Sequence, residues 1–132
     1  MVIISLMNTK INIKATNLEL TAELRNHVEG KISAIEKFMS LSADETPIVD
    51  VEVEKKYGEH HNQGEIFRAE INLQYKGEFF RTESKKEDII VAVNDAQDDM
   101  VRRVRKTRER KSDIFKRGAK NIKKMLKFGK GE

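Results

Sequence analysis

The residues best suited to chemistry in this sequence are cations crowded into one short segment. Residues 102–111 contain seven of them, namely Arg102, Arg103, Arg105, Lys106, Arg108, Arg110 and Lys111. If the segment is helical, Arg102, Lys106 and Arg110 stack on one face, because residues four apart share a face of a helix. The planar guanidinium of Arg donates two parallel hydrogen bonds to a phosphate group. We therefore predict that this segment binds the phosphates of a polyanion.

Groups suited to catalysis or to metal binding are few. The chain has no cysteine, which excludes disulfides, thiolate metal sites and a cysteine nucleophile. The adjacent His60 and His61 point apart, and no spacing of Cys or carboxylates completes a metal site around them. There is no glycine-rich phosphate loop and no GxSxG motif. We expect no enzymatic activity, no cofactor, no metal and no small-molecule substrate.

The charge is segregated along the chain. Residues 102–130 carry fourteen Lys and Arg against two acids, whereas the other residues carry twelve against twenty, so a net charge of +12 faces one of −8. Such segregation favours a basic docking surface for a polyanion, although a solvated basic helix without a ligand is the alternative. Few aromatic residues interleave with the cations, which favours recognition of the backbone and shape of folded RNA over stacking on single strands.

The elements that must position these cations follow from the period of the apolar residues. Alternating apolar residues predict strands at 10–15, 48–55, 65–75 and 78–84. Apolar residues three and four apart predict one helix over 22–39, capped by Thr21, and a second beginning near residue 85.

The order β-α-β-β-β-α predicts an α+β fold with two layers. Its four-stranded sheet carries both helices on one face, as in a double-stranded-RNA-binding domain. We expect the other face to be acidic and open to solvent, so that a polyanion meets the helices. The acids assigned to that face are Asp50, Glu52, Glu54, Glu70 and Glu78.

The predicted organisation is one domain over residues 1–111 and a basic tail over 112–132. The tail places apolar residues among lysines, with Gly118 as a boundary, and we expect it to be helical or disordered until it binds. The apolar run at residues 1–7 is too short for a signal peptide and lacks a basic start and a cleavage site. No stretch approaches the roughly 20 apolar residues of a membrane span. We therefore expect a cytoplasmic protein, for which Met7 is an alternative start.

Two segments resemble a known family. Residues 87–94 (EDIIVAVN) and 100–106 (MVRRVRK) are similar to the E-D-M-Y-x-A-I-D … L-E-R-Q-L-x-K signature of ribosome hibernation promoting factors. These proteins are also called ribosome-associated inhibitors or sigma-factor modulation proteins. Residues 21–25 (TAELR) and the later Lys31-Ile32 and Lys37-Phe38 resemble the first helix of that family. The resemblance covers about residues 7–111 and includes the β-α-β-β-β-α order.

The resemblance implies a non-catalytic inhibitor of translation. Family members lie between the head and body of the small ribosomal subunit, overlap the messenger and transfer RNA sites, and contact ribosomal RNA. They keep ribosomes inactive during stress or stationary phase. By position, Arg102 and Lys106 match the basic residues of the second helix, and Arg25 and Lys31 match those of the first.

Two departures and one omission qualify this inference. Ile90 replaces the usual aromatic residue, and Asp99 stands where a basic residue is common, which weakens one expected phosphate contact. The long form of the family carries a further dimerisation domain, which does not occur in these residues, so we expect a monomer when free. Two other functions remain open: a general double-stranded-RNA binder, and a protein-interaction module whose tail docks on a partner or on an anionic membrane.

Overall fold

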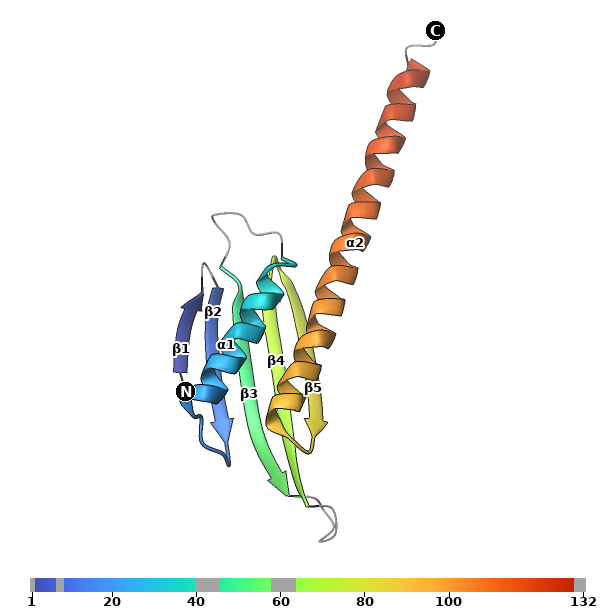
Figure 1. The fold of residues 1–132 in the computed structure, drawn as a ribbon. Helices are drawn as coiled ribbons and strands as arrows, with labels where there is room; N and C mark the ends of the chain where they lie inside the picture. Colours follow the sequence, from blue (N-terminus) through green and yellow to red (C-terminus); the bar gives the residue numbers. More distant parts are fainter. Residues whose placement is uncertain (1, 7–8, 40–45, 58–63, 130–132) are drawn as a thin grey trace.

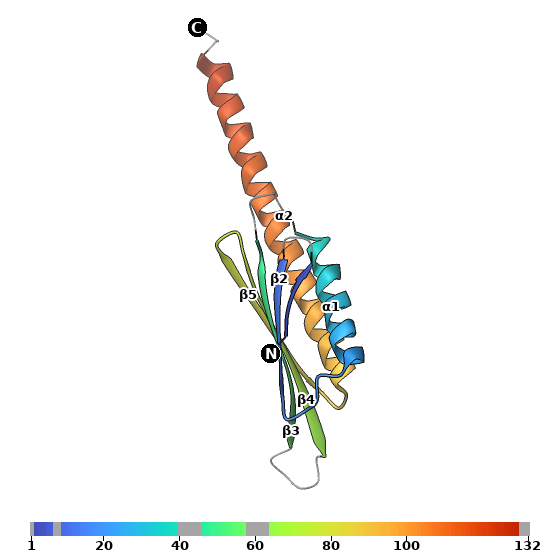
Figure 2. The ribbon, with the colours of Figure 1, turned by 90° about the vertical axis from the view of Figure 1, so that its left-hand side faces the viewer.

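The computed structural model describes residues 2–6, 9–39, 46–57 and 64–129. Its elements run in the order β1 (Val2–Leu6), β2 (Thr9–Thr16), α1 (Ala22–Glu36), β3 (Ile48–Tyr57), β4 (Glu65–Tyr75), β5 (Glu78–Lys86) and α2 (Ile89–Gly129). The strands form one sheet in the order β1-β2-β3-β4-β5. Only the β2–β3 pair is parallel, and α1 makes the crossover between these two strands. Both helices cover the same face of the sheet (Figures 1 and 2), so the predicted α+β architecture is confirmed.

The four predicted strands are β2–β5, and the sheet has one more strand than the sequence predicted. Residues Val2–Leu6 pair antiparallel with β2, so that Ile4 lies opposite Ile11. The prediction omitted this strand because its apolar run does not alternate with polar residues. With β1 in place, β2 is no longer an edge strand, and its outer backbone groups are paired.

The core lies between the sheet and the two helices. Thr21 caps α1, because its Oγ1 accepts a hydrogen bond from the amide of Leu24 at 3.1 Å. Asp88 caps α2 through the amides of Ile90 and Val91. The fully buried side chains come from β2, β3, β4 and both helices, and they include Ile11, Ile13, Val28, Ile32, Ile35, Val49, Val53, Ile71, Leu73, Val93 and Met100.

The open face of the sheet is organised around one buried cation. Arg68 is only 9% exposed, and its guanidinium pairs with the carboxylates of Glu52, Glu54, Glu70 and Glu83. Burial alone would raise the pKa of Glu70. Hydrogen bonds from Asn72 and Arg68, together with the charges of Arg81 and Arg68, nevertheless hold that pKa below its usual value. The acids of this face are thus largely neutralised within the fold.

One assignment to the open face was wrong. Glu78 lies opposite Tyr75 in the β4–β5 ladder and points to the helix side, where it pairs with Lys111 of α2. The alternation of the sequence misplaces Glu78 because this residue adjoins a tight turn, where Lys76 and Gly77 both have positive φ. Strand alternation cannot be followed reliably through such a turn.

Helix α2 packs on the domain over its first part and projects beyond it over the rest (Figure 1). Its last core residue is Val104, and all residues over 108–126 are exposed. The helix continues through Gly118, where the sequence suggested a boundary. Among the described residues, no helix is long and apolar enough to span a membrane.

Candidate nucleic-acid interface

The cationic segment 102–111 lies where α2 leaves the domain. Its first two cations are held by Asp99, whose carboxylate lies 3.7 Å from Nη2 of Arg102 and 3.3 Å from Nη2 of Arg103. Arg103 also donates from Nη1 to the backbone oxygen of Arg81 in β5 at 3.0 Å. Asp99 therefore orients both guanidinium groups while neutralising part of their charge.

The cations further along α2 are less engaged. Within the described residues, no hydrogen bond or ion pair involves Lys106, Arg108 or Arg110, and all three are exposed. Arg105 lies over the ring of Phe38, with its Cζ 5.4 Å from the ring centre. Lys111 pairs with Glu78 at 2.5 Å. The charge that is free to meet a polyanion is thus concentrated between Lys106 and Arg110.

The structure separates the two predicted site residues of α1. His27 faces α2, because its Nε2 lies 2.7 Å from Oδ1 of Asn94. Lys31 is four residues after His27 and therefore shares the side of α1 next to α2. Arg25 is two residues before His27, so it lies on the opposite side, where it pairs with Glu29 at 3.6 Å. The helices bring Lys31, but not Arg25, toward the cations of α2.

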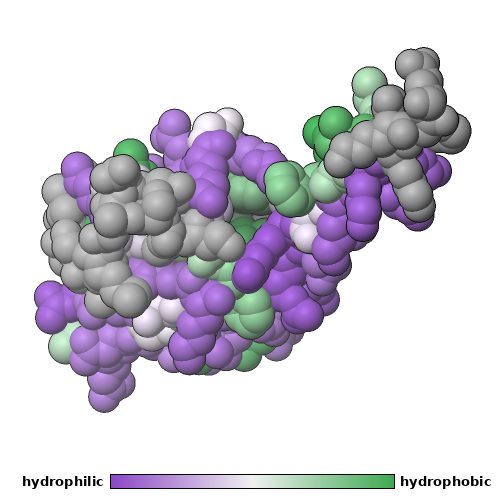
Figure 3. Space-filling model, turned by 90° about the horizontal axis from the view of Figure 1, so that it is seen from above, coloured by the Kyte–Doolittle hydropathy of each residue, from purple (hydrophilic) through white to green (hydrophobic). Residues whose placement is uncertain are grey.

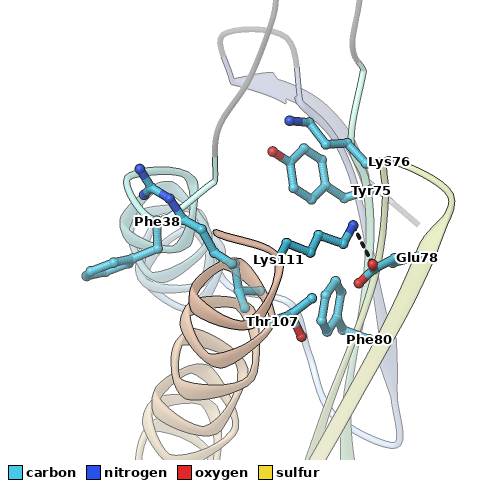
Figure 4. Close-up of a pocket in the computed structure, with 9 residues that line it drawn as sticks. Phe38, Tyr75, Lys76, Glu78, Phe80, Thr107 and Lys111 are labelled. Carbon is cyan, nitrogen blue, oxygen red and sulfur yellow. Dashed lines mark ion pairs between the residues drawn. The ribbon is translucent and has the colours of Figure 1, made fainter. Parts of the chain in front are cut away.

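Aromatic residues lie closer to the cations than the sequence suggested. Phe38 from the turn after α1, Tyr75 from β4 and Phe80 from β5 line a cavity of about 200 Å³ that also contacts Arg108 and Lys111 (Figure 4). These aromatic residues are distant from 105–111 in the sequence, so no local pattern connects them to the cations. Only the packing of α2 over the β4–β5 hairpin does so.

The projecting part of α2 has two distinct faces. Seen from above, hydrophilic side chains cover one flank of the helix, and hydrophobic ones lie on the opposite flank (Figure 3). Within the described residues, no cluster of three His, Asp or Glu side chains is suited to a metal ion. His60 and His61 lie outside those residues. The exposed, positively charged face of α2 is therefore the principal candidate site.

Replacing Asp99 with Asn is expected to strengthen binding to RNA. The change frees Arg102 and Arg103 from an exposed ion pair worth about 0–1 kcal/mol, so we expect an affinity gain of about two- to fivefold. Fluorescence anisotropy with labelled RNA at fixed salt would measure this gain. Asp98→Asn is the matched control, because it changes the net charge equally and no ion pair of Asp98 occurs in the described structure. Equal gains in both variants would mean that Asp99 has no specific effect.

Comparison with known proteins identifies one matching family model and a relative within the ribosome hibernation factors. The model of the family described as Sigma 54 modulation protein / S30EA ribosomal protein matches residues 11–112. The ribosome hibernation promotion factor of Bacillus subtilis (strain 168) is 30% identical over 105 residues, which are 80% of this chain and 51% of that protein. The chain thus spans about half the length of this relative.

Solved structures share the fold at lower identity. The N-terminal domain of Thermus thermophilus Protein Y has a TM-score of 0.59 and 23% identity, covering 73% of this chain and 94% of that one. A ribosomal subunit interface protein from Coxiella burnetii has a TM-score of 0.59 and 10% identity, covering 75% of this chain and 97% of the other. At these identities the likeness concerns the fold alone.

Proposed function

We propose, on the premise that this chain belongs to the Sigma 54 modulation protein / S30EA ribosomal protein family of hibernation factors, that it binds the small ribosomal subunit and keeps it inactive. The chain binds at the messenger and transfer RNA sites of the subunit and contacts ribosomal RNA there. The observation that carries the proposal is the exposed charge of α2 that no described residue neutralises: Lys106 and Arg110 lie four residues apart on one face. Arg108 adds a further unneutralised cation on the side of the helix that lines the cavity with Phe38.

The mechanism is occlusion without catalysis. Phosphates of folded RNA contact the cations of α2, with Lys31 on the adjoining side of α1, while the open face of the sheet, whose acids pair mainly with Arg68 and Arg81, points away from the RNA. The compact domain then occupies space that the messenger and transfer RNAs require. No bond is made or broken, and release requires only that the phosphate contacts dissociate. Such a factor acts in the cytoplasm, where ribosomes are stored during stress or stationary phase.

The salt dependence of small-subunit binding tests this mechanism. If about six phosphates are neutralised, a plot of log affinity against log salt should have a slope on the order of −4 to −5, because each contact releases condensed counterions. Co-sedimentation with purified small subunits over a salt series measures the slope. A slope near zero would contradict binding through phosphates, since apolar contacts do not release counterions.

A second candidate function is supported by the exposed apolar residues of the projecting helix. Ile114, Phe115, Ile122, Met125 and Leu126 are between 60% and 77% exposed. On a helix they fall on one face, opposite the cations Lys116, Arg117, Lys120, Lys123 and Lys124. A basic amphipathic helix of this kind is typical of segments that dock on a protein or an anionic membrane.

Removing residues 112–132 separates the two functions. If the tail contributes phosphate contacts, truncation should lower small-subunit affinity about tenfold and make the salt slope shallower. If the tail serves only another partner, small-subunit affinity should be unchanged. Flotation with phosphatidylglycerol vesicles then tests the membrane alternative. A triple variant of Phe115, Ile122 and Leu126 to Ser should lose vesicle binding if the apolar face inserts among lipids.

A further inference from the structure

The cavity between α2 and the β4–β5 hairpin has the form of a slot between two aromatic rings. Tyr75 and Phe80 lie on the helix side of neighbouring strands and are diagonal neighbours in the ladder, since Tyr75 pairs with Glu78. Diagonal neighbours are roughly 7–8 Å apart, which leaves room for one planar group between the rings. Figure 4 shows the side chain of Lys111 crossing this space from α2 to reach Glu78.

The groups around the slot have complementary chemistry. The Glu78 carboxylate lies at its far side and accepts hydrogen bonds with two oxygens. Arg108 and Lys111 from α2 line the near side, and Lys76 of the hairpin turn adds a third cation. The cavity therefore combines apolar walls, a two-oxygen acceptor and a cationic rim.

We propose that this slot binds an unpaired guanine nucleotide of RNA. The base lies between Tyr75 and Phe80 and takes the place of the Lys111 side chain, and its edge meets Glu78. The phosphate of the nucleotide meets Arg108 and the released ammonium of Lys111. The proposal rests on the proposed function only in naming RNA as the partner, and it adds a base-specific contact to binding through phosphates.

Guanine is favoured by the acceptor at the end of the slot. Its N1–H and N2–H₂ groups are adjacent donors and match the two oxygens of a carboxylate. Adenine and cytosine each present one amino group beside an acceptor nitrogen, which repels the second oxygen. Uracil presents one N–H group between two carbonyls. Unpaired bases are also the parts of RNA that proteins stack on aromatic rings and recognise by their hydrogen-bonding edges.

The properties of the Lys111–Glu78 ion pair allow guanine to replace the Lys111 side chain in the slot. Both side chains are partly exposed, at 55% and 33%, so water already weakens their attraction. When guanine takes the place of Lys111, Glu78 retains donors and Lys111 gains a phosphate. An apolar side chain of a protein partner would fill the slot but leave the Glu78 carboxylate without a donor, which makes it a poorer occupant.

Labelled single-stranded RNA tests the proposal directly. Two oligonucleotides are compared by fluorescence anisotropy at about 150 mM salt: a uridine tract with one central guanine, and the same tract with adenine instead. The full chain should bind the guanine oligonucleotide about tenfold more tightly. Phe80→Ala should weaken binding of that oligonucleotide by about five- to a hundredfold, the range found for removal of one stacking partner.

The matched control is Phe79→Ala. Phe79 is the neighbouring aromatic residue in β5, but it is 67% exposed and points to the opposite face of the sheet. This variant should keep the preference for guanine. Glu78→Gln should lose the preference for the guanine oligonucleotide while keeping the fold. If circular dichroism shows that Phe80→Ala is unfolded, the result for Glu78→Gln tests the guanine site instead.

The outcomes separate this proposal from the proposed function. Equal binding of both oligonucleotides by the unmodified chain, or equal losses in the Phe79 and Phe80 variants, would overturn the guanine site. A guanine preference that persists in Glu78→Gln would also overturn it. None of these measurements uses ribosomes. Failure of the guanine site would therefore leave small-subunit binding to be tested separately by co-sedimentation.

Discussion

A loss of about a hundredfold or more in small-subunit affinity is the expected result of replacing both Arg102 and Lys106 with Glu. These residues are four apart on one exposed face of α2, and Arg102 is 71% exposed. Hydrogen bonds to charged groups contribute about 1.5–3 kcal/mol each. Losing two of them, with added repulsion between glutamate and phosphate, gives at least the stated effect. Co-sedimentation with purified small subunits measures it, and the salt slope should become shallower by about two contacts.

The control must change the charge by the same amount elsewhere. Lys10→Glu with Lys14→Glu does so on β2, where both side chains are exposed and lie on the open face of the sheet. This variant should bind small subunits nearly as well as the unmodified chain. If both double variants lose affinity equally, net charge rather than the face of α2 governs binding, and the assignment of the interface is wrong.

Replacing Arg68 with Ala should lower the free energy of unfolding by about 3–5 kcal/mol at neutral pH. This is the usual cost of removing one partner from a buried ion pair, and here four carboxylates would lose their shared cation. Small domains have only about 5–15 kcal/mol in total, so the variant should be close to unfolding at physiological temperature. Urea denaturation followed by circular dichroism measures the change.

Arg81→Ala provides the comparison. Arg81 pairs with Glu70 and Glu83 on the same face, but its side chain is 59% exposed. Exposed pairs contribute about 0–1 kcal/mol, so this variant should lose much less stability. A loss equal to that of Arg68→Ala would show that burial of Arg68 is unimportant.

Lowering the pH should reduce the difference in unfolding free energy between the unmodified chain and Arg68→Ala. The pKa of Glu70 is lowered in the folded state. Its contribution to stability is therefore present above the pKa of the unfolded chain and is lost as the pH falls through the lower, folded-state pKa. Protonation also relieves repulsion among the carboxylates in the variant. Unfolding free energies that differ equally at pH 7 and pH 3 would contradict this account.

Much of the fold follows from the local period of the sequence. The alternation over residues 65–75 predicts β4 with the bounds observed, and Thr21 caps α1 as predicted. The period does not identify β1, because four of its five residues are apolar and they do not alternate with polar ones. It also misplaces Glu78, because the register after the turn at Lys76 and Gly77 depends on the hairpin itself.

The site is predictable only in part, for a related reason. The cations of α2 are contiguous in sequence, so a count of charges finds them. The contact of Arg105 with Phe38, the ion pair of Lys111 with Glu78 and the place of Arg25 depend on how helices and strands pack. The first two contacts join residues far apart in the chain, and the side on which Arg25 lies follows from the contact of His27 with Asn94 of α2. No local period of the sequence indicates any of them. The aromatic slot is formed by residues of β4, β5 and α2, so only the packing of these three elements reveals it.

Saturation binding of the full chain to purified small subunits, with a large excess of duplex RNA present, tests the central claim most directly. A site at the messenger and transfer RNA positions predicts near-stoichiometric binding that reaches a plateau and survives the competitor. Binding without a plateau, or complete loss to the duplex, would contradict a ribosome-specific site and indicate a general double-stranded-RNA binder.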